Sequence, residues 1–202
     1  MATKKKIKFD RDTRRIQITQ AALKIIASHG INGLTTAAIS KEVGTSEANL
    51  YRHFKNKEEI LYEMVKSIDS ELNKNFENIF KTPGTPLLNL ERVFIRHLDY
   101  IEKNEGIPRL IFSDEMHIGN VRLREMLLNT IMSYSEKLES LVKEGQKIGK
   151  IKKDISAKAA VSMLIGLIQA STMRWSLSGF SFSLVDEGNK LWKNYEKCIG
   201  VQ

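Results

Sequence analysis

Side chains of the kinds that hold phosphate are concentrated in one short segment, GTSEANLYRHFKNKEEI, residues 44–60. Within seven positions this segment places Tyr51, Arg52, His53, Lys55 and Lys57. Lysine, arginine and tyrosine side chains are common contacts to the nucleic-acid backbone, to which they add charge and hydrogen bonds. The segment therefore indicates either a surface that meets a polyanion or the solvated end of an ordinary helix.

The distribution of charge favours the first of these interpretations. The chain of 202 residues has a net charge of +8, and all of the excess lies in residues 1–57, with twelve Lys and Arg against four Asp and Glu. Residues 58–202 are balanced, with twenty of each sign. A localised basic face is typical of nucleic-acid binding. The run from Lys4 to Lys8 fits either an arm that adds salt-dependent affinity or a solvated tail, and the sequence leaves both open.

A second group of residues with possible chemistry is SDEMHIGN, which contains Asp114, Glu115 and His117. These residues suggest a metal site, or a hydrolase in which His97 or His117 works with Asp114. Three donors within four residues, without a second cluster, make a poor metal pattern. The sequence also has no nucleophile elbow and no phosphate loop. We therefore expect no enzymatic activity, no metal and no cofactor.

The elements that must position these residues are predicted to be helices. Almost nothing alternates with the period of a strand, while Leu, Ile, Lys, Glu and Met dominate, so we expect an all-α protein of about nine helices. No stretch approaches the ~18 apolar residues of a membrane span, and the basic start lacks the apolar region of a signal peptide. The single cysteine cannot form an internal disulfide. These features predict a soluble, cytoplasmic protein that does not enter a membrane.

Residues 35–54 have the pattern of a helix-turn-helix. Thr35 or Thr36 is a suitable N-cap for the helix TAAISKEV, Gly44 ends it, and Thr45 or Ser46 caps the short helix EANLYRHF. The major groove of DNA admits one helix, whose first residues read the base edges. Contacts to phosphate are therefore predicted for Tyr51, His53 and Lys57, and positions near bases for Glu47, Ala48 and Asn49.

The longer segment TTAAISKEVGTSEANLYRHFKNKEEIL resembles the DNA-binding segment of the tetracycline-repressor (TetR) family of bacterial transcription regulators. The similarity includes the threonine pair, the central glycine, the Leu-Tyr-x-His-Phe run and the Lys-Glu-Glu that follows. AALKIIASHGINGLT resembles the family's first helix, so the similarity covers roughly residues 12–72. Ser40 and Thr45 depart from it, because the family usually has alanine and valine there, and Thr45 would alter the turn or add a phosphate contact.

This resemblance implies a homodimer whose two recognition helices enter successive major grooves of a double-stranded DNA operator, with half-sites ~34–36 Å apart. Two assignments stay open: His53 could be only a helix-end residue, and Glu47 would reach a base only by accepting from a cytosine amine. The predicted DNA-binding residues are Thr36, Thr45, Ser46, Glu47, Ala48, Asn49, Tyr51, Arg52, His53 and Lys57.

The predicted domains are a basic tail at 1–11, a DNA-binding domain at 12–72 and a helical domain at 73–202. The resemblance implies that the last domain binds a ligand and dimerises. Residues 160–171 are too apolar for a helix with a single buried face. They form either intramolecular core or, with the last helix, a four-helix dimer interface. The residues proposed for that interface are Gly166, Ala170, Leu184, Leu191, Trp192 and Tyr195.

A ligand pocket is predicted between the helices of this domain, although each residue proposed for it would also suit an ordinary core. Methionines and aromatics suit an adaptable apolar cavity. The proposed lining is Phe94, His97, Leu98, Phe112, Met116, Met126, Asn129, Tyr134, Met163, Gln169, Met173 and Trp175. The resulting prediction is a repressor released from its operator by a small, largely apolar or amphipathic effector. The alternative is a DNA-binding protein of the same fold, without an inducer and controlled by a protein partner.

Overall fold

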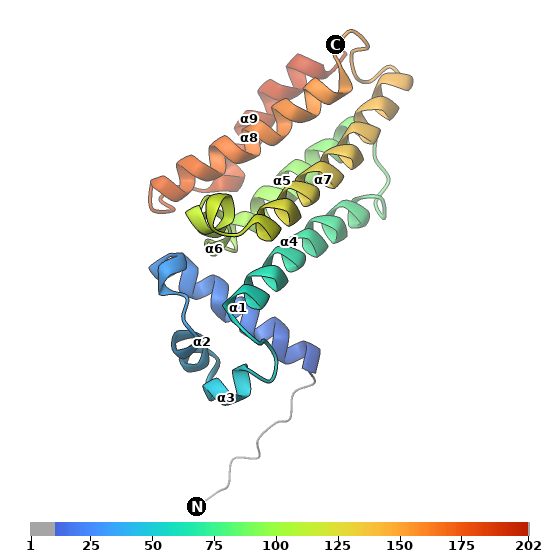
Figure 1. Cartoon of the computed structure of the whole chain (residues 1–202). Coiled ribbons are helices and arrows are strands. Elements are labelled where there is room, and N and C mark those ends of the chain that lie inside the picture. Colours follow the sequence, from blue (N-terminus) through green and yellow to red (C-terminus); the bar gives the residue numbers. More distant parts are fainter. Residues whose placement is uncertain (1–10, 202) are drawn as a thin grey trace, which may run out of the picture.

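The computed structural model describes residues 11–201, and their regular structure is helical, apart from one isolated β-bridge between Ile151 and Gly200 (Figure 1). The predicted basic tail, including Lys4 to Lys8, lies almost entirely outside the described residues. A 3-10 turn (Ile31–Gly33) and a π-helical turn (Glu115–Gly119) interrupt the α-helices. Within the described range these are α1 (Arg11–His29), α2 (Thr36–Val43), α3 (Glu47–Leu50), α4 (Lys57–Ile79), α5 (Pro86–Glu102), α6 (Gly106–Ile111), α7 (Val121–Lys147), α8 (Ala157–Leu177) and α9 (Leu184–Ile199).

The N-terminal unit consists of α1, α2, α3 and the start of α4, and its turns are set by local side chains. The hydroxyl of Thr35 accepts a hydrogen bond from the Ala38 amide, at 3.1 Å, and begins α2. Gly44 ends α2 in the left-handed conformation, with φ 69°, which a residue with a Cβ adopts only at a cost. Asn56 then caps α4 by accepting from the Glu59 amide. The helix-turn-helix predicted at residues 35–54 is therefore present as α2, turn and α3.

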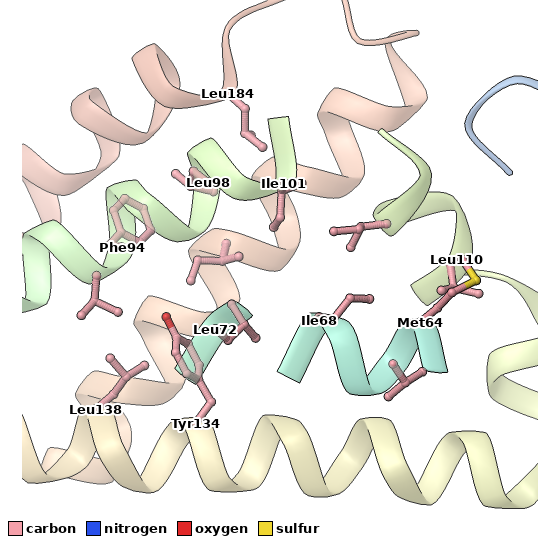
Figure 2. Close-up of a cluster of buried hydrophobic side chains, with 14 of the residues drawn as sticks. Met64, Ile68, Leu72, Phe94, Leu98, Ile101, Leu110, Tyr134, Leu138 and Leu184 are labelled. Atoms are coloured by element: carbon pink, nitrogen blue, oxygen red, sulfur yellow. The ribbon is translucent and has the colours of Figure 1, made fainter. Parts of the chain in front are cut away.

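The C-terminal unit is a bundle of long helices that lie side by side in Figure 1, namely α5, α7, α8, α9 and most of α4. Their apolar faces meet in one core. Figure 2 shows Ile68 and Leu72 of α4, Leu98 of α5 and Tyr134 of α7 converging on the space between these helices. The helix α4 runs unbroken through the boundary predicted at residues 72 and 73, so the two units share one rigid element. No helix within residues 11–201 is long and apolar enough to cross a membrane.

A short helix, α6, lies at the end of the bundle and packs against α1 (Figure 1). A side chain at Gly106 would overlap the backbone carbonyl of Leu23, so the two helices approach as closely as a glycine allows. One turn later, the guanidinium of Arg109 donates a hydrogen bond to the carbonyl of Ala27. The α6 helix therefore joins the C-terminal bundle to the first helix of the DNA-binding unit.

Candidate DNA-binding surface and ligand cavity

The recognition element is shorter than its sequence suggests. Only Glu47–Leu50 forms an α-helix, and the chain continues through turns in which the Phe54 amide donates to the Leu50 carbonyl at 3.0 Å. The expected helix EANLYRHF thus ends after one turn. Leu50 and Phe54 are almost wholly buried and anchor the element. The side chain of Tyr51 is 50% exposed, and that of Arg52 is also exposed.

The structure brings the predicted DNA-binding residues to one end of the molecule, on α2, α3 and the start of α4. Contact with DNA remains a prediction for each of them. The exposed members are Ser46, Glu47, Ala48, Tyr51 and Arg52. The half-buried members are Thr36, Thr45, Asn49, His53 and Lys57.

Several of these side chains are held by hydrogen bonds within the surface. The hydroxyl of Thr36 donates to the Glu47 carboxylate at 2.6 Å, and the amide of Asn49 donates to the Thr45 hydroxyl at 2.8 Å. The ammonium of Lys57 donates to the carbonyl of Ile31, at 3.3 Å. The surface is therefore partly ordered before any ligand arrives, which reduces the entropy lost on binding.

Arginines of α1 add to this basic surface, and the sequence-based residue set omitted them. Burial lowers the pKa of His53, and the charges of Arg14, Arg11, Arg15 and Arg52 lower it further. Arg15 also donates to the carbonyl of His53 at 2.6 Å and pairs with Glu63 at 2.6 Å. His53 is thus a neutral imidazole in a strongly positive field that attracts polyanions. Only the fold places the start of α1 beside the turn after α3.

A cavity of about 100 Å³, called here the inner cavity, lies between α4, α5, α6, α7 and α8, and the exposed Gln169 is part of its wall. Its walls are mostly apolar. Its lining residues are Ile68, Leu72, His97, Tyr100, Ile101, Ile107, Pro108, Ile111, Phe112, Leu127, Thr130, Ile131, Tyr134, Ile165, Ile168, Gln169 and Thr172. The α4 and α6 residues in this set come from helices that touch the DNA-binding unit, and the sequence-based lining did not include them.

The wall of the cavity carries one polar pair, of which Tyr134 is buried and His97 is half-buried. The Nδ1 of His97 lies 3.2 Å from the hydroxyl of Tyr134, and their rings meet edge to face. Burial lowers the pKa of His97 to about 4 and raises the pKa of Tyr134, so both side chains are uncharged at pH 7. The Thr172 hydroxyl has no hydrogen-bond partner among the described residues. The site thus offers hydrogen bonds to a ligand without offering a charge.

Four of the twelve predicted lining residues line this cavity: His97, Phe112, Tyr134 and Gln169. The other eight do not. Phe94, Leu98, Met116 and Trp175 fill the core, as the ring contact between Phe94 and Trp192 illustrates. Asn129, Met163 and Met173 face outward, and Met126 is half-buried beside the basic surface. Residue type indicates an apolar environment, but it does not separate a packed core from the wall of a cavity.

The residues predicted for a dimer interface also divide into two groups. Leu184, Trp192 and Tyr195 are buried within a single chain, where the hydroxyl of Tyr195 donates to the carbonyl of Ala160 at 2.8 Å. They are not accessible to a second copy, and Leu191 is half-buried. Gly166 and Ala170 lie on the exposed face of α8, one turn from Met163. The apolar stripe of α9 therefore packs within the chain, whereas that of α8 stays open.

The residues considered for enzymatic chemistry do not form a site. His97 faces Tyr134, while the Nε2 of His117 lies 3.0 Å from the carbonyl of Ile111. Across residues 11–201, no three His, Cys, Asp or Glu side chains come together in a way that would hold a metal ion.

Comparison with known families identifies the protein. A family described as bacterial regulatory proteins, tetR family, matches residues 18–64. A second family, described as YsiA-like protein, C-terminal region, matches residues 58–195. The chain belongs to the TetR family of bacterial transcription regulators. It is an all-α DNA-binding regulator, as the composition and the helix-turn-helix pattern predicted, and it is not an enzyme.

Curated relatives match nearly the whole TetR-type chain. The "Fatty acid metabolism regulator protein" of Bacillus subtilis is 25% identical over 176 residues, which are 87% of this chain and 90% of the relative. The "Nucleoid occlusion factor SlmA" of Vibrio cholerae is 27% identical over 194 residues, or 95% and 96% of the two chains. The crystal structure of FadR from Bacillus subtilis in complex with stearoyl-CoA shares the fold, with a TM-score of 0.74 and 23% identity over 89% of this chain and 96% of that one.

Proposed function

We propose that the protein is a cytoplasmic, homodimeric repressor that is released from a double-stranded operator by an apolar or amphipathic ligand of the acyl class. The observation that carries this proposal is the apolar inner cavity and the origin of its walls. Ile68 and Leu72 line it from α4, and the same helix begins at Lys57, beside the recognition element. DNA would therefore act at the start of this helix and the ligand near its middle.

The small size of the cavity suggests how a ligand would release the protein from DNA. An engineered cavity of ~150 Å³ holds a molecule as small as benzene, so about 100 Å³ is too small for a long chain. A chain that enters must push the walls apart, and α4 is one of those walls. Such a ligand binds best to a conformation in which α4 has moved, and this preference shifts the dimer away from the spacing that fits the operator.

The relatives support an acyl ligand, since one is a fatty acid metabolism regulator and the FadR structure contains stearoyl-CoA. The second candidate is control by a protein partner without an inducer, which the similarity to a nucleoid occlusion factor favours. A solid core in the C-terminal unit would suit that candidate. Because the cavity is present, we favour control by a ligand over control by a protein partner.

Dimerisation is proposed through the exposed stripe of α8 formed by Met163, Gly166 and Ala170. Met163 is 48% exposed, and the space above Gly166 is empty out to 4 Å. Small residues one turn apart allow a second helix to approach closely. A bundle formed by α8 and α9 of both copies would hold the two recognition elements at a fixed spacing.

The proposal is tested by DNA binding with and without ligand. The purified protein is titrated against a duplex from the region of its own gene and against a random duplex, over a range of salt concentrations. We expect tighter binding to the first, and its loss when decanoyl-CoA or stearoyl-CoA is added. The variant Thr130→Met, which narrows the cavity, should bind DNA but resist release, while Tyr51→Ala should weaken binding to both duplexes. Operator binding that no acyl ligand changes would support control by a partner.

A further inference from the structure

A second cavity adjoins the inner cavity at the end of α8 nearest to α1. Its volume is about 280 Å³, and its lining is Gly30, Pro108, Arg109, Phe112, Met173, Ser176 and Leu177. Pro108 and Phe112 line both cavities, so the two are neighbours with these side chains between them. The groove is apolar on its α8 side, where Met173 is 43% exposed and Leu177 is 81% exposed.

Arg109 is the charged residue in the lining of this groove. It lies over the ring of Phe180, at 4.9 Å from the centroid, and donates one hydrogen bond to the carbonyl of Ala27. Within residues 11–201 no carboxylate lies within ion-pair distance of Arg109. The guanidinium has five N–H donors, so its charge and most of its donors remain available to an anion in the groove.

The ring under Arg109 belongs to Phe180, whose backbone conformation is unfavourable. Phe180 has a φ of 64°, a left-handed conformation that a bulky residue rarely adopts. Its ring packs on Trp175 at 4.6 Å, and the indole of Trp175 donates to the carbonyl of Phe182 at 2.8 Å. Strained residues persist where the surrounding structure fixes them, and they are frequent at binding sites. Here the contact with Trp175 holds the strained Phe180, whose ring lies under the guanidinium.

The inner cavity has the opposite character. Neither lysine nor arginine occurs among its lining residues, and its polar atoms come from uncharged groups such as His97, Tyr134 and Thr172. An anion placed there would lose hydration without gaining a countercharge, which is strongly unfavourable. The deep part of the site therefore suits a chain, and a charge is stable only at the Arg109 end.

From this division we infer that the effector is an amphipathic anion, with its chain in the inner cavity and its anionic head group on Arg109. The inference rests on the proposed function and specifies the chemistry of the ligand. It also gives the head group a role in release. A head group bound by the free donors of Arg109 draws the guanidinium toward the groove, and so weakens its hydrogen bond to the carbonyl of Ala27 between α6 and α1.

The test compares two ligands with the same chain, decyl phosphate and decanol, and measures their binding to the full-length protein by calorimetry. For the unmodified protein we expect decyl phosphate to bind at least about tenfold more tightly, as a charge-assisted hydrogen bond provides. Arg109→Gln should reduce this ratio to about one while the affinity for decanol stays unchanged. Arg96→Gln, which removes an exposed arginine of α5 outside both cavities, should preserve the ratio.

Other results would overturn the inference. Equal affinities for the two ligands in the unmodified protein would show that no anion site exists. An equal loss of both ligands in Arg109→Gln would show that this residue only supports the fold. Decanoate and decanoyl-CoA then distinguish a carboxylate from a phosphate-bearing head group. If Arg109 recognises the charge alone, Arg109→Gln should weaken the binding of both. Release of DNA by decanol as readily as by decyl phosphate would leave the proposed function standing and refute the anion site alone.

Discussion

The carbonyl oxygen of Leu23 on α1 lies directly against Gly106 at the start of α6, with no room for a methyl group between them. Through this contact the DNA-binding unit rests on a helix that also supplies Ile107, Pro108 and Ile111 to the inner cavity. A movement of α6 would therefore displace the backbone of α1. Together with α4, this gives the cavity two physical connections to the recognition element.

The contact predicts that Gly106→Ala is destabilising. The added methyl group meets backbone rather than a flexible side chain, so α1 and α6 must separate, and we expect the free energy of unfolding to fall by about 1–3 kcal/mol. Urea denaturation measures this change. Ser70→Ala, at an exposed position of α4, is the control, and it should change the free energy of unfolding by no more than about 0.5 kcal/mol. Equal free energies of unfolding for the two variants would show that the α1–α6 contact is loose.

Ser40 is a buried position at which a hydroxyl is unfavourable. Its side chain is 4% exposed, and its Oγ has no hydrogen-bond partner among the described residues. An unpaired buried hydroxyl costs ~1–3 kcal/mol, so Ser40→Ala should raise the free energy of unfolding by about 1 kcal/mol. Thermal unfolding would detect the change, with the exposed Ser162→Ala as the control. A loss of stability in Ser40→Ala would mean that the hydroxyl has a partner, such as a buried water.

Burial of His97 predicts a pH dependence of stability. The pKa of its imidazole falls from 6.5 to about 4 on folding. Between these values the unfolded chain binds the extra proton and the folded chain does not, so the free energy of unfolding rises with pH through this window. The contribution is complete above pH 6.5 and is lost as the pH falls toward 4. It amounts to roughly 2 kcal/mol between pH 7 and pH 4.5.

Urea denaturation at pH 7 and pH 4.5 measures this effect. In His97→Gln the difference in unfolding free energy between the two pH values should shrink by that amount, whatever the variant does to absolute stability. The exposed His117→Gln should keep the full difference. An unchanged difference in His97→Gln would show that His97 is protonated in the folded protein and that the cavity admits water.

The local elements of this fold were predictable because their signals are carried by neighbouring residues. Gly44 and the caps at Thr35, Ser46 and Asn56 define the helix-turn-helix without help from distant parts of the chain. The partners of an apolar stripe are not local information. The stripe of α9 that includes Leu184 and Trp192 showed correctly that one face is buried, but it could not show that the burial is within one chain. The cavity was likewise missed in α4 and α6, whose apolar residues have the same types whether they border a void or a neighbour.

The carboxylate of Glu47 on the basic surface gives a prediction for DNA. Its hydrogen bond from Thr36 holds it beside the positions that would read bases. Glu47→Gln removes one negative charge facing phosphate, so affinity for a random duplex should rise about threefold at low salt and less at high salt. If Glu47 accepts from a cytosine amine, affinity for the operator falls at the same time. Fluorescence anisotropy with both duplexes separates the two alternatives, and Glu144→Gln, at the far end of α7, should change neither.

The open stripe of α8 gives the last prediction. Gly166 and Ala170 leave space for a second helix, and a long charged side chain there would hold two copies apart and bury an unpaired charge. We expect light scattering to give twice the chain mass of 23.1 kDa for the unmodified protein and the single mass for Ala170→Arg. Ala37→Arg, the same change at an exposed alanine of α2, should leave the dimer intact. Because one recognition element alone loses the second half-site, Ala170→Arg should also bind the operator no better than a random duplex. A dimer that survives Ala170→Arg would place the interface on another face of the bundle.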